Sequence, residues 1–451
     1  MIRQIACRRL VAFFCWLALA SWAVADEGEA AKKAAEAEKE KAYFEMIKLF
    51  ADTLDQVDRN YVKEIDRRKL IEGAIRGMLA ELDPHSGYIS PQQLEQFRTG
   101  VENEFGGVGV KVVVEGEDLK VLSPLPGSPA YRAGVQAGDI IQKIGGKSAK
   151  GITIDEARRR LKGEIGTAIP VVIFRREAML ESEFTVSLKR EIIRVHTVFG
   201  DHRNADDSWN WWCDSTHKIA YVRITGFGRH TIAELRAAMK KIAAQNHQGL
   251  VLDLRYNPGG LLSSAIEVCD LFLSEGKIVS TEGRSTAKRT WSAHKRGAYE
   301  DFPMVVLVNG YSASASEIVS ACLQDHKRAV VIGERTWGKG SVQNIINLED
   351  GASAMKLTTS SYLRPSGKNI HRFPDAKDED DWGVHPNKNF EVKFSDTEKR
   401  KLAGHFRRQD YILSPTQKAN PAKQPAPFQD RQLQKAIEYL TGRIQAGEGA
   451  E

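Results

Sequence analysis

The sequence predicts an α/β protein: a largely parallel, layered core with an inserted β-rich domain and helical N- and C-terminal segments. Residues 218–345 predict the core, because apolar runs typical of buried strands alternate there with amphipathic helical stretches. Residues 104–190 predict the β-rich domain, since short apolar runs are broken by Gly and Pro. Residues 43–80 and 430–444 carry apolar residues at helical spacing and predict the terminal helices.

The core elements follow one another as strand and helix in turn. Strands are expected at 218–225, 249–255, 302–309 and 328–333, and helices at 231–245, 261–273 and 314–326. Ligands of open α/β sheets bind beyond the carboxyl ends of the strands. The segments "DLRYNPGG" and "NGYSAS" both follow predicted buried strands, so we expect the functional residues there.

Composition excludes several classes of protein. The 451 residues suffice for two or three domains, and 42% hydrophobic with 27% charged residues is ordinary for a soluble globular chain. The formal net charge of +6 is mild and predicts neither a nucleic-acid partner nor an anionic surface.

The N-terminus resembles a targeting signal. Three arginines in the first nine residues precede an apolar run at 10–20 and the small residues "AVA" at 23–25. This pattern predicts a secretory signal cleaved after Ala25, and hence export to the periplasm or cell envelope. The alternative is an uncleaved anchor that keeps the protein at the membrane. Loss of residues 1–25 removes three positive charges and lowers the formal charge from +6 to +3.

Cysteine usage gives no metal pattern. Of five cysteines, two lie in the predicted signal, and Cys213, Cys269 and Cys322 remain. They are widely spaced and form no CxxC pair, so the sequence predicts no metal site and no disulfide framework. One disulfide bond among these three cysteines is possible but is not implied.

The expected boundaries follow changes in composition. We expect a signal peptide at 1–25, a charged lead-in and helical segment at 26–103, the β-rich domain at 104–190, the layered core at 191–413, a Pro- and Gln-rich linker at 414–429 and a C-terminal helix and tail at 430–451.

The stretch "NGYSASASEI" places Ser312, Ser314 and Ser316 at alternate positions before a predicted helix. Serines in this position commonly cap helices, so the run alone does not identify a nucleophile. A serine nucleophile also needs a base. His202, His217, His326 and His371 lie in no recognisable motif.

Lys339 is the better candidate base. It lies between two glycines in "GERTWGKGSVQ", directly after a predicted buried strand. Glycine permits close packing, so this side chain could point inward, where burial would lower its pKa and favour the neutral base. The stretch lacks the GxxxxGK[ST] spacing of a nucleotide-binding loop. The alternative is an exposed loop lysine.

Several segments resemble one family closely. They are "GAIRGMLAELDPHSGYISP", "EFGGVGV", "SPLPGSPAYRAGVQAGDII", "GLVLDLRYNPGGLL", "SASASEIVSACLQDHKRAVVIGERTWGKGSVQ" and "YLRPSGKNI". Together they resemble the carboxy-terminal processing peptidases, S41 serine proteases with a Ser–Lys dyad and a PDZ domain. The resemblance extends from about residue 43 to residue 392. It implies that residues 104–190 form the PDZ domain and residues 191–413 the serine protease core.

The resemblance assigns roles to individual residues. Ser314 matches the nucleophile and Lys339 the base, while Gln343 matches a glutamine whose amide we expect to bond the lysine ammonium. Asp325 matches an acidic position that supports the site; the alternative is a surface aspartate at a helix C-terminus.

Cleavage of a peptide bond also requires donors for the developing oxyanion. The N–H of Ala315 follows the nucleophile directly, and the second donor is expected at Gly259 or Gly260, whose lack of a Cβ lets the backbone approach a substrate.

The β-rich domain should hold peptide tails. PDZ domains add a peptide as an extra strand and bind its terminal carboxylate through backbone N–H groups. The loop that resembles this carboxylate site comprises Phe105, Gly106, Gly107, Val108, Gly109 and Val110. The alternative is an ordinary glycine turn.

The resemblance implies a secreted serine endopeptidase that cleaves proteins at or near their C-termini, with a PDZ domain that binds substrate tails and gates activity. No metal or organic cofactor is required. Partners would be protein or peptide substrates, an adaptor or activator, and further copies of the chain joined through its helical ends; no nucleic acid is expected. The rival hypotheses are a PDZ scaffold that does not cut and a serine esterase, although the GxSxG elbow of esterases is absent. A tryptophan-rich stretch, with Trp209, Trp211 and Trp212, is expected to pack between domains or to contact substrate.

Overall fold

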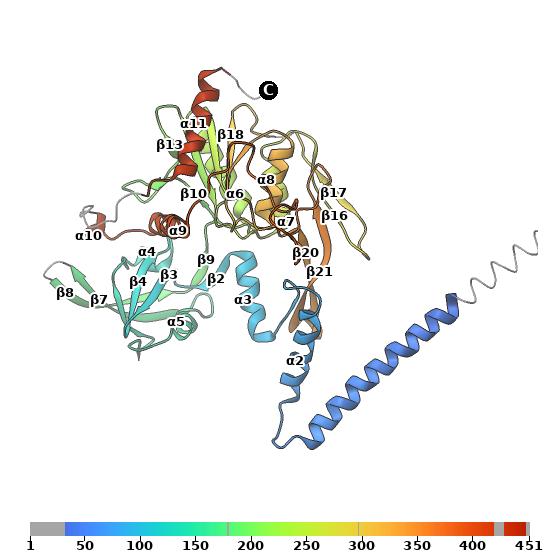
Figure 1. Ribbon diagram of the computed structural model, residues 1–451. Helices are drawn as coiled ribbons and strands as arrows, with labels where there is room; N and C mark the ends of the chain where they lie inside the picture. The colour runs from blue at the N-terminus through green and yellow to red at the C-terminus, as the bar shows by residue number, and fades with distance from the viewer. Residues whose placement is uncertain (1–31, 178–179, 296, 419–427, 448–451) are drawn as a thin grey trace, which may run out of the picture. The chain divides into compact units, whose positions relative to one another are not determined.

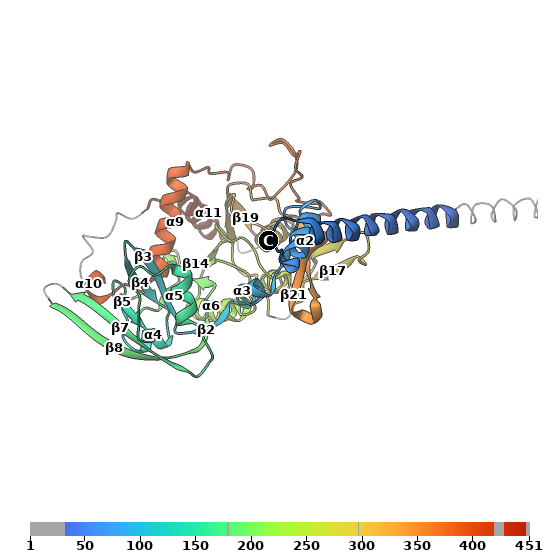
Figure 2. The same cartoon turned by 90° about the horizontal axis from the view of Figure 1, so that it is seen from below.

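The computed structural model describes residues 32–177, 180–295, 297–418 and 428–447 (Figures 1 and 2). The predicted signal peptide, and most of the predicted linker, lie outside these residues. None of the helices in the described ranges is long and apolar enough to cross a membrane. The chain divides into two compact units, Met1–Met78 and Leu79–Glu451.

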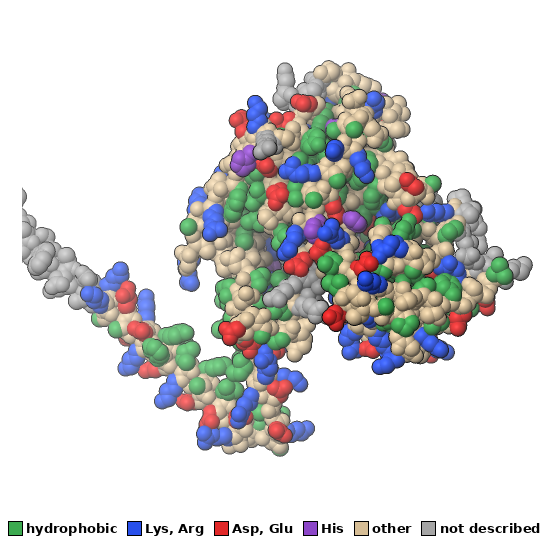
Figure 3. All heavy atoms as spheres, turned by 180° about the vertical axis from the view of Figure 1, so that it is seen from behind, with side chains coloured by type: hydrophobic (Ala, Val, Ile, Leu, Met, Phe, Trp, Pro, Cys, Tyr) green, Lys and Arg blue, Asp and Glu red, His purple; other side chains and the backbone are tan. Residues whose placement is uncertain are grey.

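The described part of the first unit, residues 32–78, is mainly helical, as predicted for residues 43–80. One helix covers residues 32–60, and α2 (Arg67–Ala80) begins after a short break. Many apolar side chains of the first helix are exposed; among the largest are Tyr43, Phe44, Ile47 and Phe50. Figure 3 shows apolar side chains gathered over this helix between charged ones.

The core of the second unit is a six-stranded mixed sheet. Its strands are β10 (Val198–Phe199), β13 (Trp212–Asp214), β14 (Ile219–Ile224), β15 (Gly249–Asp253), β18 (Met304–Val308) and β19 (Val330–Gly333). The last four are parallel and lie in chain order, whereas β10 and β13 pair with β14 in the antiparallel sense. Helices connect the parallel strands: α6 (Thr231–Ala243), α7 (Leu262–Asp270) and α8 (Ala315–Asp325).

Helices cover both faces of this sheet, which gives the predicted layers. Leu250 and Leu252 of β15 belong to a core cluster shared with α6, α7 and α8. Val251, between them, faces the opposite side and packs with Ala436 and Leu440 of α11 (Arg431–Gln445). Successive residues of a strand point to opposite faces, so a strand covered on both sides is apolar throughout. Figure 1 shows α11 along this sheet.

The prediction of a largely parallel sheet is wrong for the molecule as a whole. A second, antiparallel sheet contains β1 (Gly87–Ile89), β16 (Lys277–Glu282), β17 (Arg289–Ser292), β20 (Ser341–Leu348) and β21 (Ser353–Leu363). Only strands joined through a crossover helix run parallel here; β16–β17 and β20–β21 are joined by short connections, which permit only antiparallel pairing.

The β-rich domain has a separate core. Its six-stranded antiparallel sheet comprises β3 (Val110–Glu115), β4 (Asp118–Pro124), β5 (Ile140–Ile144), β6 (Lys147–Ser148), β7 (Ala168–Glu177) and β8 (Leu180–Lys189). The helices α4 (Pro129–Arg132) and α5 (Ile154–Leu161) accompany it, and β2 (Glu104–Gly107) pairs with β9 (Glu191–Arg194) beside it. The remaining elements are α3 (Pro91–Glu102), β11 (His202–Arg203), β12 (Trp209–Asn210), a 3₁₀ turn (Glu349–Gly351), α9 (Asp396–Asp410) and α10 (Pro415–Lys418).

The three tryptophans contact residues of the core region, and neither packing between domains nor contact with substrate is tested by these contacts. Trp211 and Trp212 pack against the cluster beneath the core sheet. Trp209 contacts Phe199 with ring centroids 5.4 Å apart and lies under the guanidinium of Arg203. The three cysteines of the described chain are free thiols.

Candidate active site

The three serines of the run differ in burial. Ser312 and Ser316 are fully buried, and their hydroxyls donate to the carbonyl oxygens of Leu254 and Asn257 at 2.8 and 2.9 Å. Both bonds tie the serine loop to the segment that follows β15. Ser314 alone is partly exposed, so only its hydroxyl can reach a ligand.

The backbone of Ser314 is strained. Its φ of 55° and ψ of −112° resemble the first central position of a type II′ turn, which glycine normally occupies. Such a conformation costs a non-glycine residue about 1–3 kcal/mol and is typical of functional sites. It turns the chain sharply from the end of β18 into α8, and Ser314 is the N-cap of that helix.

A buried carboxylate joins Ser314 to the lysine loop. Glu317 Oε2 accepts the backbone N–H of Ser314 at 2.7 Å and that of Lys339 at 2.8 Å. Glu317 Oε1 accepts the N–H of Gly338 at 2.7 Å and the hydroxyl of Thr336 at 2.6 Å. Burial raises the pKa of Glu317, but these four donors favour the ionised form. One oxygen atom therefore holds the backbones of both candidate catalytic residues.

A buried tyrosine makes a second link. The hydroxyl of Tyr362, near the end of β21, lies 3.2 Å from the carbonyl oxygen of Ser314 and also contacts the carbonyl of Lys339. Burial raises the pKa of Tyr362 well above its ordinary value, so the hydroxyl keeps its proton and can donate. The antiparallel sheet and the mixed core sheet thus meet at this site.

Lys339 is half-buried, and its pKa is lowered. Burial is the main cause, and repulsion from Lys356 of β21 lowers the pKa further. The carboxylates of Glu317 and Asp83 act in the opposite direction without outweighing burial. The neutral amine, which is the form that a general base requires, is therefore easier to reach for Lys339 than for an exposed lysine.

Two backbone N–H groups near Ser314 are without a partner in the described chain. One belongs to Ala315, the first residue of α8, and the other to Gly260. The N–H of Gly259 instead donates to the side chain of Asn257 at 2.9 Å. A Cβ on Gly259 would lie 2.8 Å from the Cβ of Ser314, so only glycine fits beside the serine.

Gln343 lies in β20, but its expected bond to the Lys339 ammonium is not formed among the described residues. The amide nitrogen donates to Ser341 Oγ at 2.9 Å and to Thr358 Oγ1 at 3.1 Å. The partners lie on the same strand and on the neighbouring β21, so the glutamine is bonded along the sheet.

Asp325 ends α8, far from Ser314. It forms hydrogen bonds of 3.0 and 2.6 Å with Arg364 and accepts the N–H of Ser366 at 3.0 Å. Burial acts to raise the pKa of Asp325, but these bonds outweigh it and hold the pKa below its usual value. Eleven residues of helix separate it from Ser314, about 16 Å, so it anchors the helix and does not reach the serine.

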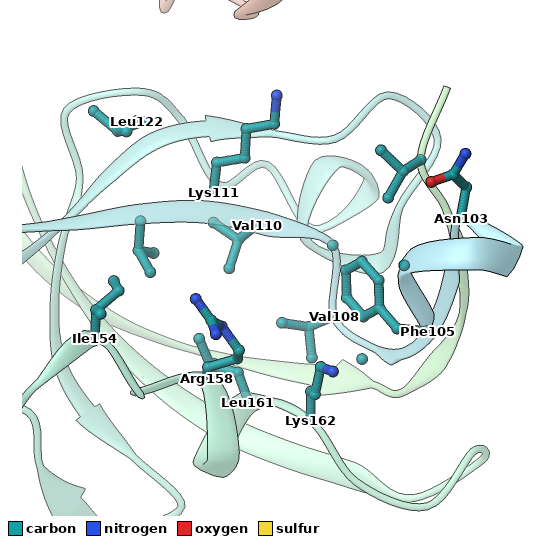
Figure 4. A pocket seen from close by; sticks show the side chains of 15 residues that line it. Asn103, Phe105, Val108, Val110, Lys111, Leu122, Ile154, Arg158, Leu161 and Lys162 are labelled. Carbon is teal, nitrogen blue, oxygen red and sulfur yellow. The ribbon is translucent and has the colours of Figure 1, made fainter. Parts of the chain in front are cut away.

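The loop predicted to bind a carboxylate lines a groove of about 590 Å³ in the β-rich domain (Figure 4). Of the six predicted residues, five are in the lining: Phe105, Gly107, Val108, Gly109 and Val110. Gly106 is not. Apolar Ile154 and Leu161 line the groove with the basic Arg158 and Lys162. The backbone N–H groups of Val108 and Gly109 make no hydrogen bond within the described ranges, which leaves them available to a carboxylate.

Comparison with known families matches three parts of the chain. Peptidase family S41 matches residues 218–386, a PDZ domain matches 120–175, and the N-terminal domain of the activating protease CtpB matches 11–92. No group of three or more potential metal ligands occurs in the described part of the chain.

Relatives match over most of the length. A carboxy-terminal-processing protease of Bartonella bacilliformis is 42% identical over 332 residues, covering 72% of this chain and 73% of that protein. The carboxy-terminal processing protease CtpA of Bacillus subtilis is 35% identical over 320 residues, covering 70% of this chain and 65% of that protein. Among solved structures, the photosystem II D1 C-terminal processing protease aligns at 30% identity with a TM-score of 0.42, covering 76% of this chain and 92% of that one.

These findings define a serine-type protease. The chain belongs to the carboxy-terminal processing protease family of S41 peptidases and carries a PDZ domain, which confirms the resemblance seen in the sequence.

Sequence reasoning missed two members of the site. Glu317 was given no role in the site, yet it accepts hydrogen bonds from both the serine loop and the lysine loop. Tyr362 was not singled out at all. The sequence offers one signal for Glu317: it lies three residues after Ser314, the spacing of a capping box.

Proposed function

We propose that the protein is an exported endopeptidase that uses Ser314 as nucleophile and Lys339 as general base. The observation that carries the proposal is the shared Glu317 oxygen, which brings the backbones of these two residues together. The strained, accessible serine and the lowered lysine pKa support the same roles.

In this mechanism, neutral Lys339 takes the hydroxyl proton as Ser314 Oγ bonds to the substrate carbonyl carbon. The tetrahedral intermediate collapses, the C–N bond breaks, and the lysine ammonium gives its proton to the leaving amine. Water then attacks the acyl-enzyme with the lysine again as base, and Ser314 is regenerated.

The N–H groups of Ala315 and Gly260 are the oxyanion donors that we propose. The carbonyl of Gly259 accepts from Phe227 at 3.0 Å. Because the C=O and N–H of a trans peptide point in opposite directions, the N–H of Gly260 points away from Phe227. Gly259 has its own N–H engaged by Asn257, which favours Gly260 of the two expected glycines.

The groove of the PDZ domain suits the C-terminal tail of a substrate. Its apolar lining would take an apolar terminal side chain, and the N–H groups of Val108 and Gly109 would bind the carboxylate. We propose that tail binding gates cleavage, that an adaptor or activator presents substrates, and that the chain is exported by its N-terminal signal. Self-association through the helical ends belongs to the same proposal.

The test is proteolysis of an unfolded model protein with an apolar C-terminal tail. The mature chain is compared with Ser314→Ala and Lys339→Met, and fragments are identified by mass spectrometry. Cleavage by the unsubstituted chain alone supports the dyad. Unchanged cleavage by Lys339→Met would contradict it, and binding of the tail without cleavage by any form would favour the scaffold hypothesis.

A further inference from the structure

The side chain of Arg255 lies two residues after β15 and is fully buried. Its Nη2 donates to Asp253 Oδ2 of the same strand at 2.6 Å. Its two terminal nitrogens also reach both carboxylate oxygens of Asp430, at 2.9 and 2.7 Å. Nη1 donates further to Gln432 Oε1 at 2.9 Å. The last two partners belong to the start of α11, which is 175 or more residues away in the chain.

The first turn of α11 is built around this contact. Asp430 is the N-cap of the helix and accepts the N–H groups of Gln432 and Leu433 at 3.1 and 3.0 Å. Gln432 is fully buried, and its amide nitrogen donates to the carbonyl of Val392 at 2.7 Å. The bidentate pair between Arg255 and Asp430 therefore fixes the position of the N-terminal end of α11, because such a guanidinium–carboxylate pair allows little rotation.

Arg255 stands directly before the proposed oxyanion loop. Tyr256 N donates to Asn309 Oδ1 at 3.1 Å, and Asn257 O accepts the N–H of Ala313 at 3.1 Å. The loop that carries Gly259 and Gly260 is thus bonded on one side to the serine loop. On the other side, through Arg255, it is bonded to the C-terminal helix.

We infer that α11 is a clamp for catalysis: Asp430 and Gln432 are positioning residues that hold Arg255 and, through it, the oxyanion loop in register with Ser314. The inference rests on the proposed function and extends it to a segment outside the region matched to the peptidase family. Loosening the clamp should slow acylation, since an oxyanion donor acts only when it is in place before reaction. Substrate affinity should change little, because the tail-binding groove lies elsewhere in the chain.

The test variant is Asp430→Asn. Asparagine is about as good an N-cap as aspartate, so the helix keeps its cap while the ion pair to Arg255 is lost. Asp253 still neutralises Arg255, so the fold should survive. The matched control is Leu440→Ala, which loosens α11 at the other end of β15, where Leu440 lies near Gly249.

Each variant is measured for kcat and KM on the tailed substrate, for its thermal unfolding midpoint, and for amide hydrogen exchange of residues 256–261. The expected result is that kcat of Asp430→Asn falls about tenfold or more with KM nearly unchanged and faster exchange in the loop. Leu440→Ala should keep kcat even though its midpoint falls at least as far. Asp430→Glu, which restores a carboxylate, should recover part of kcat.

Three outcomes would overturn the clamp: wild-type kcat in Asp430→Asn, equal loss of kcat in both variants, or unchanged exchange of the loop. An inactive unsubstituted chain would instead contradict the proposed function. In that case the exchange measurement still decides whether α11 holds the loop.

Discussion

Ser314 is set apart from its neighbours by backbone conformation and burial. The sequence shows three serines at equal spacing, and spacing alone cannot choose among them. The structure buries Ser312 and Ser316 in hydrogen bonds to the segment after β15 and leaves Ser314 strained and accessible. The resemblance named the same serine without giving the physical reason, which depends on φ and ψ.

The strain at Ser314 leads to a prediction about stability. Ser314→Gly should be more stable than Ser314→Ala by about 1 kcal/mol, because relief of 1–3 kcal/mol of strain exceeds the entropic cost of glycine. Both variants should be inactive. Urea unfolding measures the difference.

The matched control for this comparison is Ser320, inside α8, where the backbone is helical. There glycine should be less stable than alanine by about 1 kcal/mol. The same sign at both positions would show that Ser314 is not strained.

The charge of Lys356 should affect the pH range in which Lys339 can act as a base. Its repulsion lowers the pKa of Lys339, second only to burial. Removal of the charge in Lys356→Gln should raise that pKa, so less of the lysine is neutral at pH 7. The acid limb of kcat/KM should then move to higher pH, with a several-fold loss of activity at neutral pH.

Lys356→Arg keeps the charge and should leave the pH profile in place. A shift of the limb to lower pH in Lys356→Gln would contradict the assignment of Lys339 as the base. Measurement of kcat/KM from pH 5 to 10 with a peptide substrate covers the range.

At the scale of elements, the predictable part of the fold is the part with local signals. Apolar strands alternate with amphipathic helices in residues 218–345, and the four parallel strands and three helices appear where the sequence places them. β20 and β21 gave no such signal, because their residues are mostly half-exposed and only a few are buried. The pairing of β21 with β1, more than 260 residues earlier in the chain, is a tertiary contact that no local pattern encodes.

The site, too, has a part that can be predicted from local sequence patterns and a part that cannot. Its positions at the ends of β15 and β18 follow from the strand pattern. The roles of Glu317 and Tyr362 could not be predicted, since each depends on two loops that meet only in the folded chain.

A substitution at Asp325 tests whether the C-terminal end of α8 serves stability alone, while its N-terminal end beside Ser314 serves catalysis. Asp325→Asn should lower stability by about 1–3 kcal/mol, because a partly buried Arg364 loses its ionic partner. The value of kcat should not change, given the length of helix between this residue and Ser314. Unfolding and peptidase assays on the same preparation separate the two effects.

The loss of stability in Asp325→Asn should depend on pH. The folded pKa of Asp325 is lowered, so its contribution is present above the unfolded pKa and disappears as pH falls through the folded value. The difference in free energy of unfolding between wild type and Asp325→Asn should therefore have its full value at pH 7 and should disappear in acid, below about pH 4. A loss of kcat at full stability would restore a direct role for Asp325 in the site.

At the scale of the whole molecule, residues 32–78, the described part of the first unit, include many apolar side chains but no buried residue. Along the helix at residues 32–60, apolar side chains recur at spacings of four and three: Tyr43, Ile47, Phe50, Leu54 and Val57. This is the spacing of a coiled-coil seam. All but Leu54 are exposed, so the stripe is available to a second copy of the chain.

We expect the mature protein to self-associate through this stripe, and Phe50→Asp to weaken that association by at least tenfold in Kd, since a charge in the seam must be desolvated. Sedimentation equilibrium gives the mass of each form. Lys48→Asp, on the opposite face of the same helix, is the control and should leave the mass unchanged. If Phe50→Asp associates as strongly as the unsubstituted protein, the contact lies elsewhere, and the C-terminal helix is the next segment to test. If the unsubstituted protein is a monomer at all concentrations, self-association through either end is excluded.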